Sequence, residues 1–169
     1  MITETLTKEE LLTEVESTAA GLLNLVGAVE ESKFNTVPYE GSWTAGQLVR
    51  HVSKSTVSIA KALNKRGQLA QRNAGEKIAL LRDTFLNFSN KFQAPEFIIP
   101  EERTYDKQAT IEELGHAFEQ FKTNASSADV NEIVEGLPMG TVTKLELIHF
   151  VIYHTKRHIH QLEKISKAI

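Results

Sequence analysis

The sequence contains no cysteine, and this absence excludes several kinds of chemistry. Without thiols there can be no disulfide framework, no cysteine-ligated metal site and no cysteine nucleophile. A cysteine-free chain suits the reducing cytosol, so we expect a cytoplasmic protein. The N-terminus, Met1-Ile2-Thr3-Glu4, is neither basic nor followed by an apolar core, and we therefore expect no signal peptide.

An excess of one charge and long apolar runs are also missing. The 19 Lys and Arg residues nearly balance the 22 Asp and Glu residues, which gives a net charge of −3 and a pI near 6.1. Nucleic-acid binding normally requires a concentrated basic face, so we expect no nucleic-acid partner. No apolar stretch approaches the length of a membrane span, so we expect no membrane association.

Proline is scarce, and its positions indicate where helices end. The four prolines all fall between periodic segments, at Pro38, Pro95, Pro100 and Pro138. No strand-like alternation persists for more than a few residues. A length of 169 residues fits one domain with a sizeable core. The sequence therefore predicts a single all-α domain spanning residues 1–169.

Helical periodicity predicts four long helices and one weaker helical stretch. The expected ranges are about 8–31, a second helix from 42 or 44 to about 67, the weaker stretch 76–92, then 110–128 and 143–167. Capping boxes are expected at three helix starts, where Thr7, Thr110 and Thr143 are followed three residues later by glutamate. The long connection between the second helix and the penultimate one indicates that two neighbouring helices run parallel. The predicted fold is a four-helix bundle with a long crossover connection.

The histidines are the most informative residues. Four of the six lie between residues 149 and 160. His154 and His158 are one helical turn and roughly 40° apart, on the side of the last helix that carries the apolar residues. An unsatisfied buried imidazole costs about 1–3 kcal/mol, so a buried pair requires a shared reason.

A metal ion is one such reason, because side chains at i and i+4 can direct ring nitrogens at the same ion. The alternative is a pair of histidines hydrogen-bonded within the bundle, and the spacing alone favours neither. A third ligand must come from another helix, where His51 beside the apolar stripe of the second helix is the best candidate. The competitor, His116, is flanked by polar residues and is expected on the solvent side. No glutamate lies between His154 and His158, so the zinc-protease motif HExxH is absent.

Two segments resemble the signatures of the DinB-like superfamily of damage-inducible, YfiT-like proteins. The first is a tryptophan followed by a histidine in residues 43–52, WTAGQLVRHV. The second is a small turn from Pro138, a capped helix, and the paired histidines followed by Gln161, ending in HFVIYHTKRHIHQL. The order of the motifs, the gap of roughly a hundred residues between them and the total length also resemble this family over nearly the whole chain.

The resemblance implies a four-helix bundle with a long crossover and a metal bound by three histidines, which correspond here to His51, His154 and His158. It also implies a homodimer, with zinc or nickel as the usual divalent ion. Relatives in this superfamily include transferases and isomerases that use a low-molecular-weight thiol, namely glutathione, mycothiol or bacillithiol. Many others have no assigned reaction, so the resemblance does not choose a specific activity.

Three imidazole ligands leave at least one coordination position open for water or substrate. The leading hypothesis is therefore a metal-dependent enzyme, specifically a thiol-dependent S-transferase acting on a small-molecule electrophile. One alternative is a metal-dependent hydrolase, which needs a general base that the sequence does not reveal. Another is a metal- or ligand-binding stress protein without turnover.

Several neighbouring residues receive simpler interpretations. Trp43 is expected to pack at the start of the second helix, where it would also wall the site. Gln161 is a candidate hydrogen-bond partner of a metal-ligating imidazole. Arg50, Lys156 and Arg157 are interpreted as solvated side chains on helix faces rather than as binding residues.

Overall fold

The structure, a computed structural model, describes residues 6–169; the expectation for residues 1–4 lies outside this range. The helices are α1 (Lys8–Gly27), α2 (Ala45–Asn64), α3 (Ile78–Phe85), α4 (Lys107–Ser127) and α5 (Lys144–Ala168). Short 3-10 turns η1 (Glu31–Lys33) and η2 (Glu96–Ile98) and two short strands, β1 (Ile133–Val134) and β2 (Val142–Thr143), lie between them. None of the helices in residues 6–169 combines the length and apolar character needed to cross a membrane.

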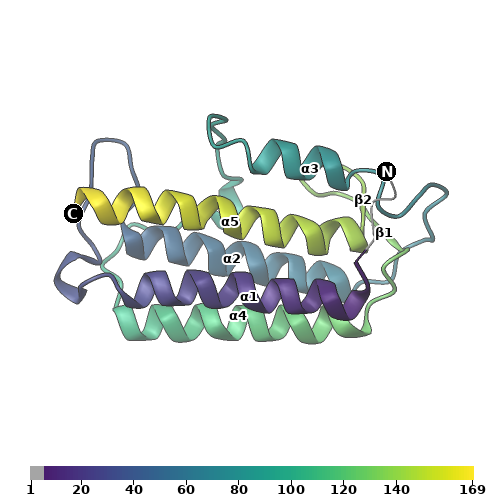
Figure 1. The fold of residues 1–169 in the computed structure, drawn as a ribbon, viewed down its shortest axis with the longest axis horizontal. Helices are drawn as coiled ribbons and strands as arrows, with labels where there is room; N and C mark the ends of the chain where they lie inside the picture. The colour runs from purple at the N-terminus through teal and green to yellow at the C-terminus, as the bar shows by residue number, and fades with distance from the viewer. Residues whose placement is uncertain (1–5) are drawn as a thin grey trace.

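Helices α1, α2, α4 and α5 form a bundle, and α3 lies outside it against α5 (Figure 1). Neighbours α2 and α4 run parallel, because Arg50 pairs with Glu113 near their starts and Asn124 donates to the Ala60 carbonyl further along both helices. Helices α1 and α4 are antiparallel, since the Lys8 amine reaches the carbonyl of Ala128. The predicted four-helix bundle with a long crossover and a parallel neighbouring pair is therefore confirmed.

Three of the bundle helices begin at capping boxes. Thr7, Thr44 and Thr143 each accept a hydrogen bond from the backbone N–H three residues later, while the side chain of that later residue returns one. The capping box predicted at Thr110 is wrong. Asp106, a strong N-cap residue, accepts from the Ala109 N–H and starts the helix earlier.

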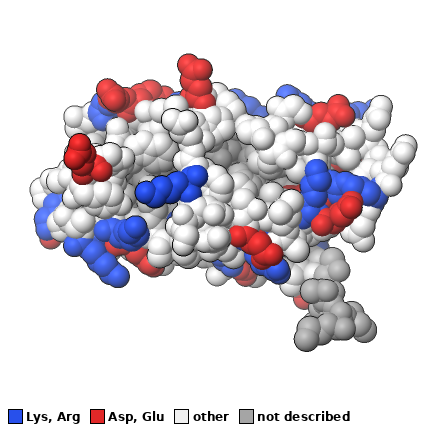
Figure 2. All heavy atoms as spheres, turned by 90° about the horizontal axis from the view of Figure 1, so that it is seen from above, with Lys and Arg blue, Asp and Glu red and all other residues white. Residues whose placement is uncertain are grey.

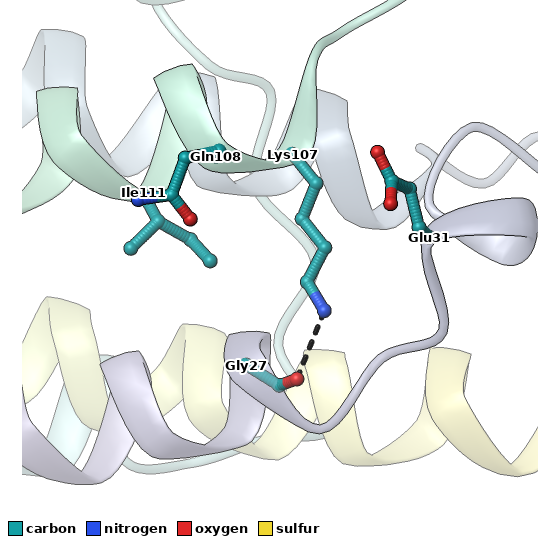
Figure 3. A pocket seen from close by; sticks show the side chains of 5 residues that line it. All are labelled: Gly27, Glu31, Lys107, Gln108 and Ile111. Carbon is teal, nitrogen blue, oxygen red and sulfur yellow. Dashed lines mark hydrogen bonds between the residues drawn. The ribbon is translucent and has the colours of Figure 1, made fainter.

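Helix α1 is shorter than the predicted range and ends at Gly27. Lys107 at the start of α4 donates from its amine to the carbonyls of Gly27 (2.9 Å) and Val29 (2.6 Å). Its charge meets the carbonyl end of a helix whose own last turn has no basic residue. Figure 3 shows this amine crossing a pocket of about 310 Å³ between the two helices.

Helix α3 is also shorter than predicted, because turn-forming residues follow it. The Asn87 side chain accepts from the Ser89 N–H, and the Asn90 side chain donates to the Thr84 carbonyl. Such side chains compete with the helical hydrogen bonds and stop the helix. Phe88 and Phe92, which the predicted range 76–92 includes, lie beyond the end of α3 and are 44% and 50% exposed. Over the face that carries α3 and α5, acidic and basic side chains are interspersed around a central hollow (Figure 2).

The two short strands were not expected from the sequence. They pair antiparallel, with Ile133 opposite Thr143 and Val134 opposite Val142. Thr143 is both a residue of β2 and the N-cap of α5. The hairpin therefore fixes where α5 begins relative to the end of α4.

Glu146 in the first turn of α5 is completely buried, and both oxygens of its carboxylate accept hydrogen bonds. It accepts from the backbone N–H groups of Thr143 (2.8 Å) and Lys77 (2.9 Å). Both oxygens also accept from the guanidinium of Arg72, at 2.6 and 2.8 Å. Because Arg72 and Lys77 belong to the crossover, this carboxylate joins the crossover to the start of α5.

Replacing Arg72 by Ala should destabilise the protein by about 3 kcal/mol, because it leaves a buried carboxylate without its charged partner. Chemical denaturation followed by circular dichroism measures this change. The matched control is Arg82→Ala, which breaks a pair with Asp83 whose side chains are 51% and 68% exposed. That control should cost about 1 kcal/mol or less. Equal losses in the two variants would contradict a special role for the buried pair.

Candidate metal centre

His51 from α2 and His154 and His158 from α5 meet in the interior of the bundle. Their Nε2 atoms are 3.2 Å apart for His51 and His154, and 3.1 Å apart for the two pairs that include His158. All three side chains are buried. The competitor His116 is 81% exposed, as predicted, and lies away from this cluster. We call these three side chains the histidine cluster.

The start of α2 is held close to the crossover, which places His51. Gly46 in the first turn lies against Tyr105 and Phe34, and a Cβ atom at this position would be 3.0 Å from the Cβ of Tyr105. The Gly46 N–H also donates to the Phe34 carbonyl at 3.0 Å. A side chain at position 46 would therefore require Tyr105 or Phe34 to shift by a few tenths of an ångström, so glycine permits this close packing at the start of α2.

Hydrogen bonds at Nδ1 orient two of the three rings. His51 Nδ1 lies 3.0 Å from the backbone carbonyl of Ile98, and His158 Nδ1 lies 2.8 Å from Oε1 of Gln161. Both partners accept, so each Nδ1 carries the proton and each neutral ring directs an Nε2 lone pair into the cluster. The contact expected of Gln161 is thus present, whereas the Ile98 carbonyl gave no signal in the sequence.

The converging nitrogens fit a divalent metal ion. Two lone pairs 3.1 Å apart, on His51 and His158, repel one another unless a proton or a cation lies between them. An N–H on His154 can point at only one of them at a time. Three nitrogens bound at about 2.1 Å to one ion, as in tetrahedral or octahedral sites, are separated by about 3.0 to 3.4 Å. The observed spacing falls within that range.

Burial keeps the cluster neutral. It lowers the pKa of His51 below the ordinary value of 6.5, although the hydrogen bond to Ile98 opposes this shift. Burial lowers the pKa of His154 well below the ordinary value, and that of His158 to about 3. The positive charge of Arg157 further lowers the pKa values of His154 and His158. Neutral imidazole is the form that binds a metal.

Aromatic rings surround the cluster. The Trp43 ring centroid lies 4.8 Å from that of His51, and Phe150 stacks on His154 at 5.2 Å. Phe85 at the end of α3 is 6.5 Å from His154. Within residues 6–169, the group of side chains able to ligate a metal here consists of the three histidines and includes no carboxylate. The contact of Phe150 with His154 could have been predicted from the sequence, because the two residues are four apart on one helix. The contact of Phe85 could not, because it lies on a different helix.

The interpretation of Arg50 and Arg157 as solvated side chains is wrong. Arg157 donates to the carbonyls of Phe85, Asn87 and Asn90 and lies over the Phe92 ring, which fastens the crossover to α5. Arg50 forms ion pairs with Glu101 and Glu113. Lys156 does remain 41% exposed, paired with Glu14 across the surface.

The remaining histidines of α5 lie outside the cluster. His149 is half-buried, and its Nδ1 is 3.3 Å from the Tyr153 hydroxyl. His160 stacks on Phe88 with ring centroids 4.1 Å apart. The side of α5 that carries His149 and His160 is therefore partly covered, by Tyr153 on the same helix and by Phe88 of the crossover.

Comparison with known families identifies the class of protein. The model of the DinB superfamily matches residues 14–162, and the chain belongs to this superfamily. Comparison with curated proteins gives no match.

Two solved structures share the fold. One is the four-helix bundle protein TT2238, with a TM-score of 0.61 at 18% identity over 93% of this chain and 98% of the other. The second is YfiT from Bacillus subtilis, with a TM-score of 0.61 at 15% identity over 99% of this chain and 91% of the other. YfiT is described as a probable metal-dependent hydrolase with an unusual four-helix bundle topology.

The metal-free protein should lose stability as the pH falls from 7 to 5. Unfolded imidazoles take up protons near pH 6.5, while the cluster stays neutral when folded, so acid favours the unfolded state. His154→Gln removes one such site and should make the loss smaller by about 1–2 kcal/mol over this interval. Urea denaturation at pH 5, 6 and 7 with a chelator present measures the effect.

The exposed His116 provides the control for this experiment. Its imidazole is in contact with water in both states, so His116→Gln should leave the slope of stability against pH unchanged. A slope that is the same in wild type and His154→Gln would contradict a neutral histidine cluster.

Proposed function

We propose that His51, His154 and His158 bind one divalent metal ion, zinc or nickel, and that the chain is a metal-dependent enzyme. The observation that carries this proposal is the convergence of three buried Nε2 atoms at 3.1–3.2 Å. Three protein ligands with an open position are the arrangement of catalytic rather than structural zinc sites. A small-molecule substrate and a homodimer, as the family resemblance implies, belong to the same proposal.

The reaction we propose is transfer of a low-molecular-weight thiol to a small electrophile. A bound divalent ion would supply Lewis acidity and would lower the pKa of a coordinating thiol, whose proton would pass to water, so the protein itself would need no general base. A reaction without a general base agrees with the surroundings of the histidine cluster, where the aromatic rings of Trp43 and Phe150 lie against the imidazoles. The roles of the chain's own residues are to orient the three imidazoles, to exclude water with Trp43, Phe85 and Phe150, and to accept the electrophile beside them.

A metal-dependent hydrolase is the second candidate, and the fold shared with YfiT favours it. Hydrolysis uses water as the nucleophile and benefits from a carboxylate base. The buried carboxylate on the same helix is Glu146, about 12 Å before His154 along the axis. Both of its oxygens are already bound by Arg72 and by backbone N–H groups. It is therefore not available as that base, and the thiol reaction is preferred.

A protein purified without affinity tag or chelator should contain about one zinc or nickel ion per chain. His51→Ala and His158→Ala should each reduce the metal content to near zero, because two imidazoles do not hold a divalent ion tightly. Elemental analysis of the purified proteins measures this directly. The matched control is His160→Ala, on the same helix but outside the cluster, and it should retain the metal.

Metal-free wild type, even after incubation with zinc, nickel and manganese, would contradict the metal site. Full metal content in either of the two cluster variants would contradict the ligand set. A third outcome, metal in the wild type without turnover in any assay, would favour the stress protein that binds a metal or ligand without catalysis.

The metal-loaded protein should accelerate conjugation of a thiol with an aryl halide, in which a carbon–sulfur bond forms and halide leaves. Glutathione, mycothiol and bacillithiol are the thiols to compare, with product followed by absorbance. His158→Ala should return the rate to that of the uncatalysed reaction, and His160→Ala should not. Ester or amide hydrolysis without added thiol, lost in the same variant, would instead support the hydrolase.

A further inference from the structure

The carbonyl that orients His51 belongs to an irregular segment. Ile98 is the last residue of the 3-10 turn η2, and its carbonyl accepts the proton on His51 Nδ1 at 3.0 Å. The other oriented ring, His158, is held by Gln161 on its own helix. The position of His51 Nε2 therefore depends on how firmly the crossover is held against α2.

An ion-pair cluster fastens this part of the crossover to α2. The Glu101 carboxylate accepts from Arg50 through Nε at 2.9 Å and Nη2 at 3.0 Å. Lys54 bridges the same segment, because its amine donates to the Ile99 carbonyl at 2.9 Å and to Glu101 at 3.1 Å. Arg50 and Lys54 lie one turn apart on α2, on either side of His51 in sequence.

We propose that Glu101 is a positioning residue of the histidine cluster. Its ion pairs with Arg50 and Lys54 hold the Ile98 carbonyl against His51 Nδ1, which keeps the His51 proton on Nδ1 and its Nε2 lone pair directed at His154 and His158. In an imidazole, the hydrogen bond made by one nitrogen decides which nitrogen carries the proton. The part of this inference that concerns metal affinity rests on the proposed function, and the part that concerns the tautomer does not.

The exposure of these ion pairs indicates that they position the Ile98 carbonyl rather than stabilise the whole fold. Glu101 is 44% exposed and its partners Arg50 and Lys54 are 22% and 21% exposed, so these pairs add little to global stability. Their effect is local, because they restrain Ile99 and Glu101, which lie one and three residues after Ile98. Glu113 offers a matched comparison, since it pairs with the same Arg50 but belongs to α4 rather than to the crossover.

The experiment compares Glu101→Gln with Glu113→Gln by two measurements. Long-range proton–nitrogen NMR correlation on the metal-free protein reports which His51 ring nitrogen carries the proton. Competition with a chromophoric chelator gives the dissociation constant for zinc. Glu101→Gln should produce a mixture of His51 tautomers and weaken zinc binding by about tenfold or more. Glu113→Gln should keep the single tautomer and bind zinc within about twofold of wild type.

Lys54→Met provides the decisive variant if Glu101→Gln does not fold. It also separates the positioning effect on zinc affinity from a purely electrostatic effect. Loss of a nearby positive charge should by itself strengthen cation binding. Positioning predicts the reverse, a weaker affinity together with a mixed His51 tautomer. Because the two explanations predict changes of opposite sign in zinc affinity, this variant distinguishes them.

An unchanged His51 tautomer in Glu101→Gln would overturn the proposal, as would equal losses of affinity in the two glutamate variants. Stronger zinc binding by Lys54→Met would also overturn it. If the wild type binds no zinc but Glu101→Gln still mixes the tautomers, the positioning role stands and the proposed function fails.

Discussion

The buried carboxylate of Glu146 is the interaction on which the rest of the structure depends. It closes the capping box of α5 and accepts from Arg72 and Lys77 of the crossover, so one side chain joins the last helix, the hairpin before it and the segment that covers it. A helix is a rigid spacer, and fixing its first turn fixes every later side chain. His154 and His158 lie two and three turns further on, and their place in the core follows from where α5 begins.

Neutrality is the second constraint, and it links stability to the chemistry of the site. Three imidazoles can share a dry interior only if they remain uncharged, and burial lowers the pKa of each of them. An empty cluster still places two lone pairs against one another, which costs free energy. The three buried rings, with Trp43 and Phe150 packed against them, therefore have the geometry and the neutral charge on which the proposed metal site rests.

The sequence predicted the regular parts of the molecule well. The apolar stripes of α2 and α5 and the capping box at Thr143 define the helices that carry the site, and the interruption of a stripe revealed His154 and His158. His51 was harder, because a single helical histidine usually has a simpler role. The interactions that sequence reasoning missed join distant residues through irregular backbone. The Ile98 carbonyl and the Arg72–Glu146 pair depend on the path of the crossover, which no periodic pattern describes. Asp106, four residues before Thr110, caps α4 in place of the expected residue.

The topology also determines when the site can come into existence. His51 meets His154 and His158 across 103 and 107 residues of chain, with the crossover and α4 between them. Contacts so distant in sequence close late, because the entropy of a large loop must be overcome first. During synthesis, His51 on α2 emerges long before His154 and His158 on α5. A metal ion therefore cannot serve as an early nucleus for folding, and a chain that ends before α5 is left with a single imidazole where the finished protein has three.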